Sequence, residues 1–335
     1  MDRPFKVLLY TEFENINKIS GLGKAVRHQA QALRENNIPY TRNPRDDYDI
    51  AHINVWGPVS YFVAKSARRK GKKVVYHAHS TEEDFRNSFI FTNQLAPLVK
   101  KWLIKCYKTG DIILTPTPYS KHLLEGYGLK NIHVISNGVD TNFFSPNPEG
   151  AKSFRAQYGY KTTDKIIVGI GLYIKRKGIL DFIELAKHFP EYQFIWFGTA
   201  PRATIPLEIN RALATAPKNL KFPGHVPAET IRDALSACNC YVFPTLEETE
   251  GIPIIEACSV GAPTLIRDIP VFDPWMVDGV NTHKAKTLDD FIKKLPLIVD
   301  KQLPDLSNAA RQVAEERDIK KVGLELIKLY RSLLK

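Results

Sequence analysis

Cysteine and long apolar runs are both scarce in this 335-residue chain. Its four cysteines are too few for a disulfide-stabilised scaffold. The longest apolar runs, near Leu9, Ile170 and Phe197, fall well short of the roughly 20 residues that cross a bilayer. The N-terminal residues also lack the apolar segment and small-residue cleavage site of a secretory signal peptide. These absences predict a cytoplasmic protein with no membrane-spanning helix.

The chain has an ordinary globular composition with an excess of positive charge. Hydrophobic residues make up 44% and charged residues 25% of the sequence, and its length suits two domains. The net charge is +11, and residues 1–150 carry 21 Lys and Arg against only 14 Asp and Glu. A basic first half favours a polyanionic partner, which leaves nucleic acid, a phosphorylated ligand and an anionic membrane to be distinguished.

Short apolar runs alternate with helical patterns along both halves of the chain. In the first half, the sequence predicts strands at residues 6–11, 48–56, 73–77, 111–117 and 133–139, with helices at 25–33, 60–67 and 120–126. In the second half, it predicts strands at 166–172, 193–197, 219–222, 240–244 and 263–267, with helices at 180–188, 228–237 and 252–260 and a helical tail over 287–335. Residues 144–150 contain two prolines and a glycine, which indicates a linker. This alternation predicts an α/β protein with two parallel sheets, each covered by helices on both faces.

The segment Gly21-Leu-Gly23-Lys24 lies between a predicted strand and a predicted helix. Ligands of open parallel sheets bind beyond the carboxyl ends of the strands, so such segments are where chemistry is expected. Gly21 and Gly23 would let backbone amides approach a phosphate at the start of the helix. The complete G-x-G-x-x-G pattern is absent because residue 26 is Val. A tight turn without a ligand is the alternative interpretation.

A second glycine-bounded turn carries three consecutive cations. Lys175, Arg176 and Lys177 stand between Gly171 and Gly178, after the first strand of the second half. Cations at such a place are suited to hold a diphosphate. The alternative is a solvated basic turn.

Two carboxylates stand eight residues apart in the segment Glu248–Glu256. Glu248 is predicted in a loop after a strand, Gly251 at a close backbone turn, and Glu256 inside the helix that follows. Two α/β domains facing each other would form a cleft, and a carboxylate on a helix directed at such a cleft suits the hydroxyl groups of a sugar or ribose. Surface acids are the alternative, but Glu256 lies in an apolar run where a lone charge is costly unless it has a partner.

His77 and His79 follow the predicted strand at residues 73–77. Two histidines at a strand end are suited to bind a metal ion, but no third His or local carboxylate completes a site, so no metal is expected. A hydrogen bond from one of them to a substrate is the favoured interpretation. Structural histidines with satisfied hydrogen bonds are the alternative.

Two basic segments of the first half suggest a surface partner. One contains Arg68, Arg69 and Lys70, and the other is a predicted helix with Lys100, Lys101, Trp102 and Lys105. Lysines on one side and Trp and Leu on the other are typical of a helix that lies in a membrane interface. A core-packed helix with a solvated lysine face is the alternative. Nucleic acid is not expected, because the sequence has no zinc finger or RNA-binding motif.

Taken together, these motifs resemble the GT4 family of retaining glycosyltransferases, which have the GT-B fold. The resemblance covers nearly the whole chain. Its most specific part is Glu248–Glu256 with the flanking Pro-Thr-Leu and Glu-Ala-Cys-x-x-Gly-Ala-Pro, and Asn137-Gly-Val-Asp140 is similar to the family's segment before the linker. The resemblance implies two Rossmann-like domains facing across a cleft. Residues 1–148 would bind the acceptor, with a C-terminal helix at about 319–335 packing back on them, and residues 149–318 would bind the nucleotide-sugar.

The resemblance also implies a role for each matched residue. Glu248 would lie near the transferred sugar and Glu256 would bind the ribose, with Gly251 and Ile252 beside them. Lys177 would bind the diphosphate, and the amides of Gly21 and Gly23 would reach the same phosphates. His79 would hydrogen-bond the donor sugar, with His77 as the alternate. The family's usual Gly-Arg-Leu-x-x-x-Lys-Gly has Leu172 in place of its Arg, and Arg176 is expected to supply that cation.

The turn at residues 171–178 is similar to that of bacterial enzymes that glycosylate diacylglycerol or glucosyl-diacylglycerol. The implied reaction moves glucose or galactose from a UDP-sugar to a lipid acceptor, with retention and without a metal ion or other cofactor. It would take place at the anionic inner face of the cell membrane. The alternatives are transfer to a capsule, exopolysaccharide or other soluble glycan, a non-catalytic GT-B partner protein, and a nucleotide-sugar epimerase.

Overall fold

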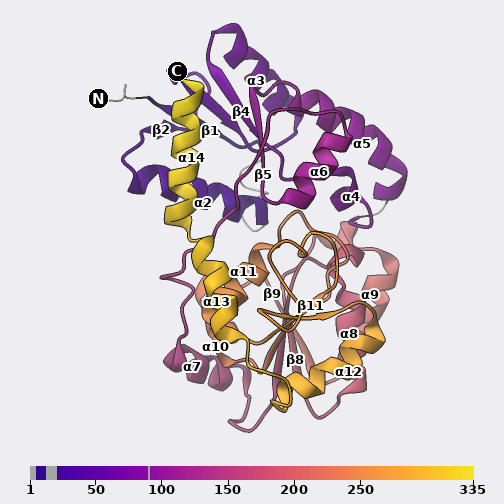
Figure 1. Cartoon of the computed structure of the whole chain (residues 1–335). Helices are drawn as coiled ribbons and strands as arrows, with labels where there is room; N and C mark the ends of the chain where they lie inside the picture. The colour runs from indigo at the N-terminus through magenta and orange to yellow at the C-terminus, as the bar shows by residue number, and fades with distance from the viewer. Residues whose placement is uncertain (1–4, 13–20, 90) are drawn as a thin grey trace. The chain divides into compact units, whose positions relative to one another are not determined.

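The computed structural model describes residues 5–12, 21–89 and 91–335, and the chain divides into two compact units (Figure 1). The first unit comprises Met1–Phe85, Gln94–Asp140 and Arg317–Lys335. The second comprises Arg86–Asn93 and Thr141–Glu316. The C-terminal segment therefore belongs to the first unit, although most of the second unit precedes it in the sequence.

The first unit contains a six-stranded sheet in the order β2-β1-β3-β4-β5-β6, and all of its pairings are parallel. Its strands are β1 (Val7–Tyr10), β2 (Tyr40–Thr41), β3 (Ile50–Ile53), β4 (Lys73–His77), β5 (Ile112–Thr115) and β6 (Ile132–Val134). The apolar strand residues divide by alternation between two cores. Val7 and Leu9 enter one core, while Leu8, between them, enters the other. Both faces of the sheet are therefore buried, as the continuous apolar strand runs require.

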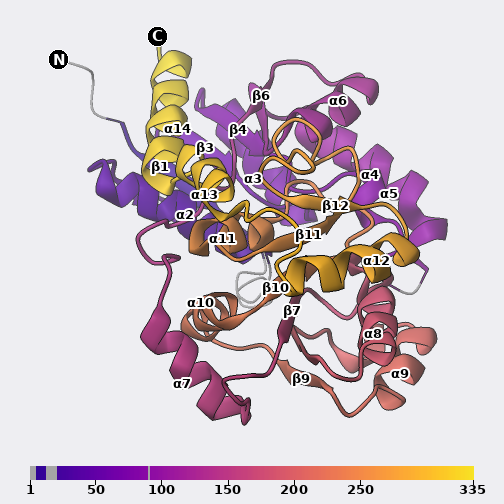
Figure 2. The ribbon, with the colours of Figure 1, turned by 60° about the horizontal axis from the view of Figure 1, so that its bottom comes forward.

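Helices cover both faces of this first sheet. Two of them, α2 (Gly21–Glu35) and α14 (Ile319–Leu333), pack side by side, and both views show α14 in yellow beside the indigo α2 (Figures 1 and 2). Gly323 of α14 makes this approach close, because a Cβ there would lie 2.8 Å from the Cβ of Ala32. The other core includes residues of α3 (Pro58–Arg69), α5 (Thr92–Tyr107) and α6 (Pro118–Gly126). A short helix, α4 (Glu82–Phe85), follows β4.

The second unit repeats this architecture with a second parallel sheet of six strands, in the order β12-β11-β10-β7-β8-β9. Its strands are β7 (Ile166–Ile170), β8 (Gln193–Phe197), β9 (Leu220–Gly224), β10 (Cys240–Phe243), β11 (Thr264–Arg267) and β12 (His283–Ala285). Its helices are α7 (Pro148–Tyr158), α8 (Ile179–His188), α9 (Leu207–Ala214), α10 (Ala228–Ala237), α11 (Ile252–Val260), α12 (Leu288–Val299) and α13 (Ser307–Glu316), with short 3-10 turns at Lys175–Lys177 and Arg202–Thr204. The order places β7 and β10 side by side at the middle of the sheet.

The predicted α/β class with two parallel sheets is confirmed. The sequence missed the edge strands β2 and β12, which are only two and three residues long. It also extended the linker to residue 150, whereas α7 begins at Pro148. Asn147 caps that helix by accepting a hydrogen bond from the Gly150 amide, and Pro148 suits its first turn. Among the described residues, no helix is both long enough and apolar enough to cross a membrane.

Candidate functional site

In the second unit, the loops that follow β7 and β10 meet because the two strands are neighbours. The Lys175–Lys177 turn follows β7, and it ends at Gly178 with a left-handed φ of 72°. A Cβ on Gly178 would lie 2.1 Å from the carbonyl oxygen of Pro244, the first residue after β10. Glycine is therefore required there by both the backbone conformation and the close approach of the second loop.

Glu248, in the loop after β10, lies between two cations from the loop after β7. Its carboxylate forms an ion pair with Lys177 and lies 3.8 Å from the guanidinium of Arg176. Thr245 adds a hydroxyl 2.9 Å from the Glu248 Oε1. The side chains of all three charged residues are at most 15% exposed. The structure thus gathers a mostly buried charge cluster at the carboxyl edge of the sheet, where ligands of such sheets bind.

Arg176 is also held by backbone groups and by a segment far away in sequence. Its side chain donates to the carbonyl of Glu247 at 2.9 Å and to the hydroxyl of Ser88 at 3.1 Å. Its backbone amide donates to the carbonyl of Asn87 at 3.0 Å. The segment Arg86–Asn93, which the second unit takes from between α4 and α5, therefore fixes the position of this guanidinium.

The second carboxylate of the pair lies on α11, which follows the Glu248 loop. Gly251 precedes this helix with a left-handed φ of 93°, and Ile252 is its first residue. Glu256 is completely buried in its middle. Burial raises the pKa of Tyr241 on β10 well above its usual value, and the nearby charges of Glu256 and Glu248 raise it further. Both carboxylates therefore lie close enough to β10 to raise the pKa of the same tyrosine.

In the first unit, three imidazole rings form a stack that we call the histidine column: His52, His77 and His79. The ring centroids of His52 and His77 are 5.4 Å apart, and those of His77 and His79 are 3.9 Å apart. His52 lies in β3 and His77 ends the neighbouring β4. The column therefore stands at the carboxyl edge of the first sheet, with His52 and His77 buried and His79 half-buried.

Two amide side chains connect the column. Gln29 of α2 uses its Nε2 to bond the Nδ1 of His77 and the Oδ1 of Asn54, both at 2.9 Å. The Nε2 of His79 lies 3.0 Å from the same Asn54 oxygen. At the other end of the column, the hydroxyl of Tyr330 on α14 lies 2.5 Å from the Nδ1 of His52. The C-terminal helix therefore reaches the histidines through a buried hydroxyl.

The column is built from neutral rings. Burial, with a smaller contribution from the nearby His79, lowers the pKa of His52 to about 3. Burial alone lowers the pKa of His79 to about 3. For His77, burial followed by the two neighbouring rings lowers the pKa well below its usual range. At neutral pH these residues act as hydrogen-bonding groups rather than as cations.

The two glycines of the first predicted motif begin α2. Gly21 is exposed, and a Cβ added there would meet no atom within 4 Å. Gly23 is buried within the first turn of the helix. The residues just before them, 13–20, lie outside the described part of the chain. Gln29 of the histidine network lies on this same helix.

The basic segments of the first unit lie on α3 and α5, which contact each other. The ring of Trp102 lies 5.5 Å from that of Tyr61, and its indole nitrogen donates to the carbonyl of Trp56. Trp102 is therefore half-buried between the helices. Lys100 is half-buried too, since it pairs with Glu82 at 3.0 Å. The remaining predicted cations are exposed: Arg68, Arg69, Lys70, Lys101 and Lys105.

Large apolar side chains lie exposed on the same two helices. Phe62 and Leu98 are 66% and 63% exposed, and Val59 and Leu95 are 51% and 47% exposed. We call these four residues the α3–α5 apolar face. Lysines border it, because Lys65 and Lys105 both lie over the ring of Tyr61, beside Phe62. Neither helix contains an Asp or a Glu.

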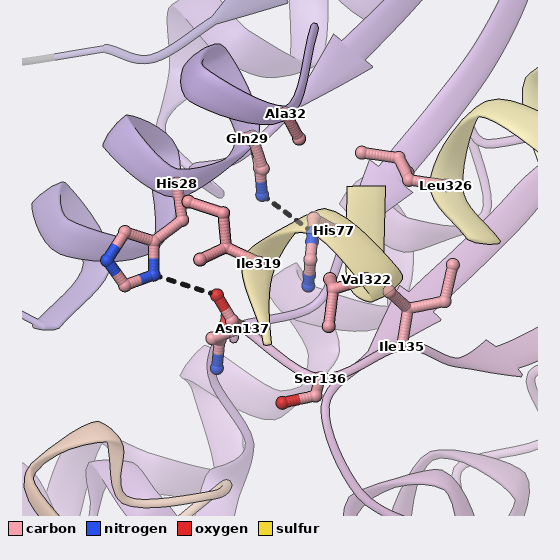
Figure 3. Close-up of a pocket in the computed structure, with 10 residues that line it drawn as sticks. All are labelled: His28, Gln29, Ala32, His77, Ile135, Ser136, Asn137, Ile319, Val322 and Leu326. Carbon is pink, nitrogen blue, oxygen red and sulfur yellow. Dashed lines mark hydrogen bonds between the residues drawn. The ribbon is translucent and has the colours of Figure 1, made fainter. Parts of the chain in front are cut away.

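No cluster of three or more His, Cys, Asp or Glu with metal-ligand geometry occurs in the described ranges. His77 instead lines a cavity of about 10 Å³ with His28, Gln29, Asn137 and neighbouring apolar residues (Figure 3). A space of this size suits one water molecule rather than a substrate.

Sequence reasoning missed several members of these two sites. His52 and Asn54 had a usable signal, since they stand at the end of the strand that pairs with the His77 strand. Thr245 also had a usable signal, because it directly follows the predicted strand that ends at Pro244. Ser88 and Tyr330 had none, because each is separated from its partner by a long stretch of sequence: 88 residues for Ser88 and 278 for Tyr330.

Sequence comparison identifies the class of protein to which these two sheets belong. The family model described as Glycosyltransferase Family 4 matches residues 19–143, and the model described as Glycosyl transferases group 1 matches residues 151–317. The processive diacylglycerol alpha-glucosyltransferase of Acholeplasma laidlawii is 35% identical over 332 residues, which are 98% of this chain and 99% of that protein. The chain therefore belongs to glycosyltransferase family 4.

Two further likenesses are more distant. The alpha-galactosylglucosyldiacylglycerol synthase of Streptococcus pneumoniae is 26% identical over 260 residues, covering 76% of this chain and 69% of that protein. The crystal structure of Anabaena Alr3699/HepE in complex with UDP and glucose aligns with a TM-score of 0.79 at 17% identity, covering 98% of this chain and all of that one. This structural likeness shows the fold, which is GT-B.

The neutral histidines make the stability of the first unit depend on pH. The pKa values of His52 and His79 are about 3 in the fold, the pKa of His77 is well below its usual range, and all three are about 6.5 in an unfolded chain. At pH values between the folded and unfolded pKa, the unfolded chain binds more protons than the folded chain. The stabilisation is complete above about pH 6.5 and is lost as the pH falls. Over this range, each ring is expected to change the free energy of unfolding by up to about 1.4 kcal/mol per pH unit.

Denaturant titrations between about pH 7 and about pH 5 measure this effect. His52→Gln is expected to weaken the pH dependence. His133→Gln, which replaces an exposed histidine of the same unit, is expected to leave it unchanged. A wild-type stability that does not change over this range would contradict the prediction.

Proposed function

We propose that this protein transfers glucose from UDP-glucose to diacylglycerol, and then to glucosyl-diacylglycerol, at a membrane surface. The observation that carries the proposal is the likeness to the processive diacylglycerol alpha-glucosyltransferase, which extends over 98% of the chain. A relative that spans both units shares the acceptor part as well as the donor part. The synthase of Streptococcus pneumoniae, also named for a glycosyl-diacylglycerol product, supports the same acceptor class.

The second unit is the donor-binding part of this proposal. Charge develops on the diphosphate as the sugar leaves, and Lys177 and Arg176 stabilise it where little water is present. Glu248 faces the transferred sugar, and Glu256 binds the ribose hydroxyls. Gly251 and Ile252 lie at the start of α11, where backbone amides favour an anion. That UDP and glucose were bound in the structural relative is consistent with this donor.

Donor binding then requires an exchange of partners. Lys177 is paired with Glu248, and a diphosphate would take the lysine while sugar hydroxyls take the carboxylate. Both groups are mostly buried, so neither tolerates the loss of one partner without gaining another. The exchange ties nucleotide binding to the orientation of Glu248 beside the sugar.

The first unit is the acceptor-binding part. His79 hydrogen-bonds the transferred sugar, and the amides near Gly21 and Gly23 contact the phosphates. The departing phosphate takes the proton of the acceptor hydroxyl, so no separate base is needed. The anomeric configuration is retained. The cations do the work of a metal ion in neutralising the leaving group, so the reaction needs no divalent metal.

The α3–α5 apolar face brings the first unit to the membrane. Four exposed apolar side chains bordered by lysines, on helices without acidic residues, suit the interface of an anionic bilayer. Burying Phe62 and Leu98 among lipid chains removes apolar surface from water, while the lysines meet lipid phosphates. The protein would thus lie peripherally on the membrane that holds its acceptor.

A transfer assay tests the reaction. The full chain is incubated with UDP-[14C]glucose and vesicles that contain diacylglycerol and an anionic phospholipid. Label is expected in the organic phase, first as glucosyl-diacylglycerol and then as the diglucosyl lipid, in alpha linkage. Label that stays in water with a soluble glycan acceptor would replace the lipid proposal with polysaccharide synthesis. An absence of turnover with any donor would favour a non-catalytic role.

The same assay tests the diphosphate cation. Lys177→Ala is expected to lower kcat about a hundredfold, because charge on the leaving group is no longer neutralised. Lys175→Ala is the matched control, since this lysine belongs to the same turn but is exposed and pairs with Glu208 at 3.5 Å. It is expected to keep nearly wild-type turnover. Unchanged turnover of the double variant Arg176→Ala/Lys177→Ala at saturating donor would remove both cations from the mechanism.

Vesicle sedimentation tests the membrane face. The double variant Phe62→Ser/Leu98→Ser is expected to bind anionic vesicles at least about tenfold more weakly, because it loses two inserted apolar side chains. Leu207→Ser, which removes an equally exposed leucine from the second unit, is the matched control. High salt is expected to weaken the wild type. Equal vesicle binding by the wild type and the double variant would exclude the α3–α5 apolar face as the membrane-binding surface.

A further inference from the structure

Arg176 and Glu248 carry opposite charges at short range, but they do not form a hydrogen-bonded ion pair. Their closest nitrogen and oxygen atoms are 3.8 Å apart, which is beyond the reach of a hydrogen bond. Arginine and carboxylate side chains prefer a bidentate pair, in which two N–H groups of the guanidinium donate to the two carboxylate oxygens. Other contacts therefore hold this guanidinium away from the carboxylate, although both side chains are mostly buried.

Two oxygen atoms compete with Glu248 for the N–H groups of Arg176. A guanidinium can present to a carboxylate either its side edge, which includes Nε, or its end, which includes Nη1. The hydroxyl of Ser88 accepts a hydrogen bond from Nε at 3.1 Å, and the carbonyl of Glu247 accepts one from Nη1 at 2.9 Å. Ser88 therefore blocks the side-on pair, and the Glu247 carbonyl weakens the end-on pair.

Ser88 lies beside a pair of asparagines that bond each other. The backbone amide of Asn87 donates to the Oδ1 of Asn93 at 2.9 Å, and the Nδ2 of Asn93 donates to the Oδ1 of Asn87 at 3.0 Å. We call this pair the asparagine clasp. Asn87 has a left-handed φ of 53°, a conformation that Asn adopts more readily than most residues. Both asparagines are exposed, whereas Ser88 is only 4% exposed.

Backbone hydrogen bonds set the distance between Ser88 and Arg176. The carbonyl of Asn87, the residue before Ser88, accepts from the backbone amide of Arg176 at 3.0 Å. The carbonyl of Arg176 accepts from the amide of Leu246 at 2.7 Å. The backbone of Arg176 is thus held on one side by the clasp segment and on the other by the loop after β10. The Ser88 hydroxyl is in place for the guanidinium without an adjustment of long, flexible side chains.

We propose that Ser88 is a positioning residue of the donor site, which keeps Arg176 from pairing closely with Glu248 so that the guanidinium can bind the donor diphosphate. The inference rests on the proposed function, because that function supplies the diphosphate. Without the Ser88 hydroxyl, the Nε–H of a mostly buried guanidinium would lose its acceptor, and the carboxylate of Glu248 would replace it. A diphosphate would then have to break that pair in order to bind. Lys177 has the other part, since it is the cation that contacts Glu248 directly.

Equilibrium binding of UDP and of uridine to the full chain tests the role of Ser88. Ser88→Ala is expected to weaken UDP binding about tenfold, because the diphosphate must compete with Glu248 for Arg176. The affinity for uridine, which has no phosphate, is expected to stay unchanged. Thr264→Val is the matched control, since it removes a hydroxyl that is also 4% exposed and bonds Thr282 at the start of β11. It is expected to keep the wild-type affinity for UDP.

Two backgrounds test whether Ser88 acts through this pair of charges. In Glu248→Gln, no carboxylate is present to capture the guanidinium, so adding Ser88→Ala is expected to change UDP affinity less than about twofold. In Arg176→Ala, no guanidinium is present, and the same small change is expected. A full tenfold loss in either background would overturn the proposal, because Ser88 would then act by another route.

A surface variant tests the same role without altering a buried side chain. Asn93→Ala opens the asparagine clasp, and it is expected to weaken UDP binding in the same direction as Ser88→Ala while uridine affinity stays unchanged. Gln94→Ala changes the next exposed residue and is the control. Equal UDP affinities of Asn93→Ala and Gln94→Ala would overturn the proposal.

The outcomes separate this inference from the proposed function. If the wild type transfers no sugar to lipid but Ser88→Ala selectively loses UDP affinity, the acceptor assignment fails and the role of Ser88 stands. If the wild type transfers glucose to lipid and Ser88→Ala binds UDP as the wild type does, only the role of Ser88 fails. If Ser88→Ala loses UDP and uridine affinity equally, as a merely less stable chain would, the positioning role is also overturned.

Discussion

The second unit is organised around one buried carboxylate. Glu248 is only 7% exposed at its side chain, and a charge in that position is tolerated only with cations and hydrogen-bond donors around it. Lys177, Arg176 and Thr245 meet this requirement from two different loops. The need to neutralise the carboxylate therefore joins the loops after β7 and β10. The left-handed backbone at Gly178 follows from the same constraint, because the Pro244 carbonyl occupies the space of a side chain there.

The buried polar groups at the carboxyl edge of the first sheet are neutral rather than charged. Its histidines are neutral because burial removes the charged form, and hydrogen bonds through Gln29 and Asn54 connect His77 and His79. The two carboxyl edges thus have complementary chemistry. One holds a cluster of ion pairs around Glu248, and the other holds a network of neutral rings and amides.

Much of the fold could be read from the sequence, and the exceptions have physical reasons. Continuous apolar runs such as Ile166–Ile170 identify buried parallel strands because both faces of the sheet are covered. The helix at Ala228–Ala237 was predicted to the residue from its apolar period. The edge strands β2 and β12 were missed because two or three residues are too few to show a period.

In the candidate site, Lys177 and Glu248 were found through their flanking glycines and apolar strands. The membrane role expected of Trp102 stays a prediction, and the structure adds that its indole nitrogen donates to the Trp56 carbonyl while Phe62 and Leu98 are exposed.

The sequence by itself determined the α/β class, the two-part organisation and the family. These depend on local periodicity and on short motifs whose residues are neighbours in the chain. Only the tertiary structure decided that Lys177 pairs with Glu248, that Ser88 holds Arg176, and that Tyr330 reaches His52. Such contacts join residues 71 to 278 positions apart, and they are set by strand order and helix packing, which no local pattern encodes.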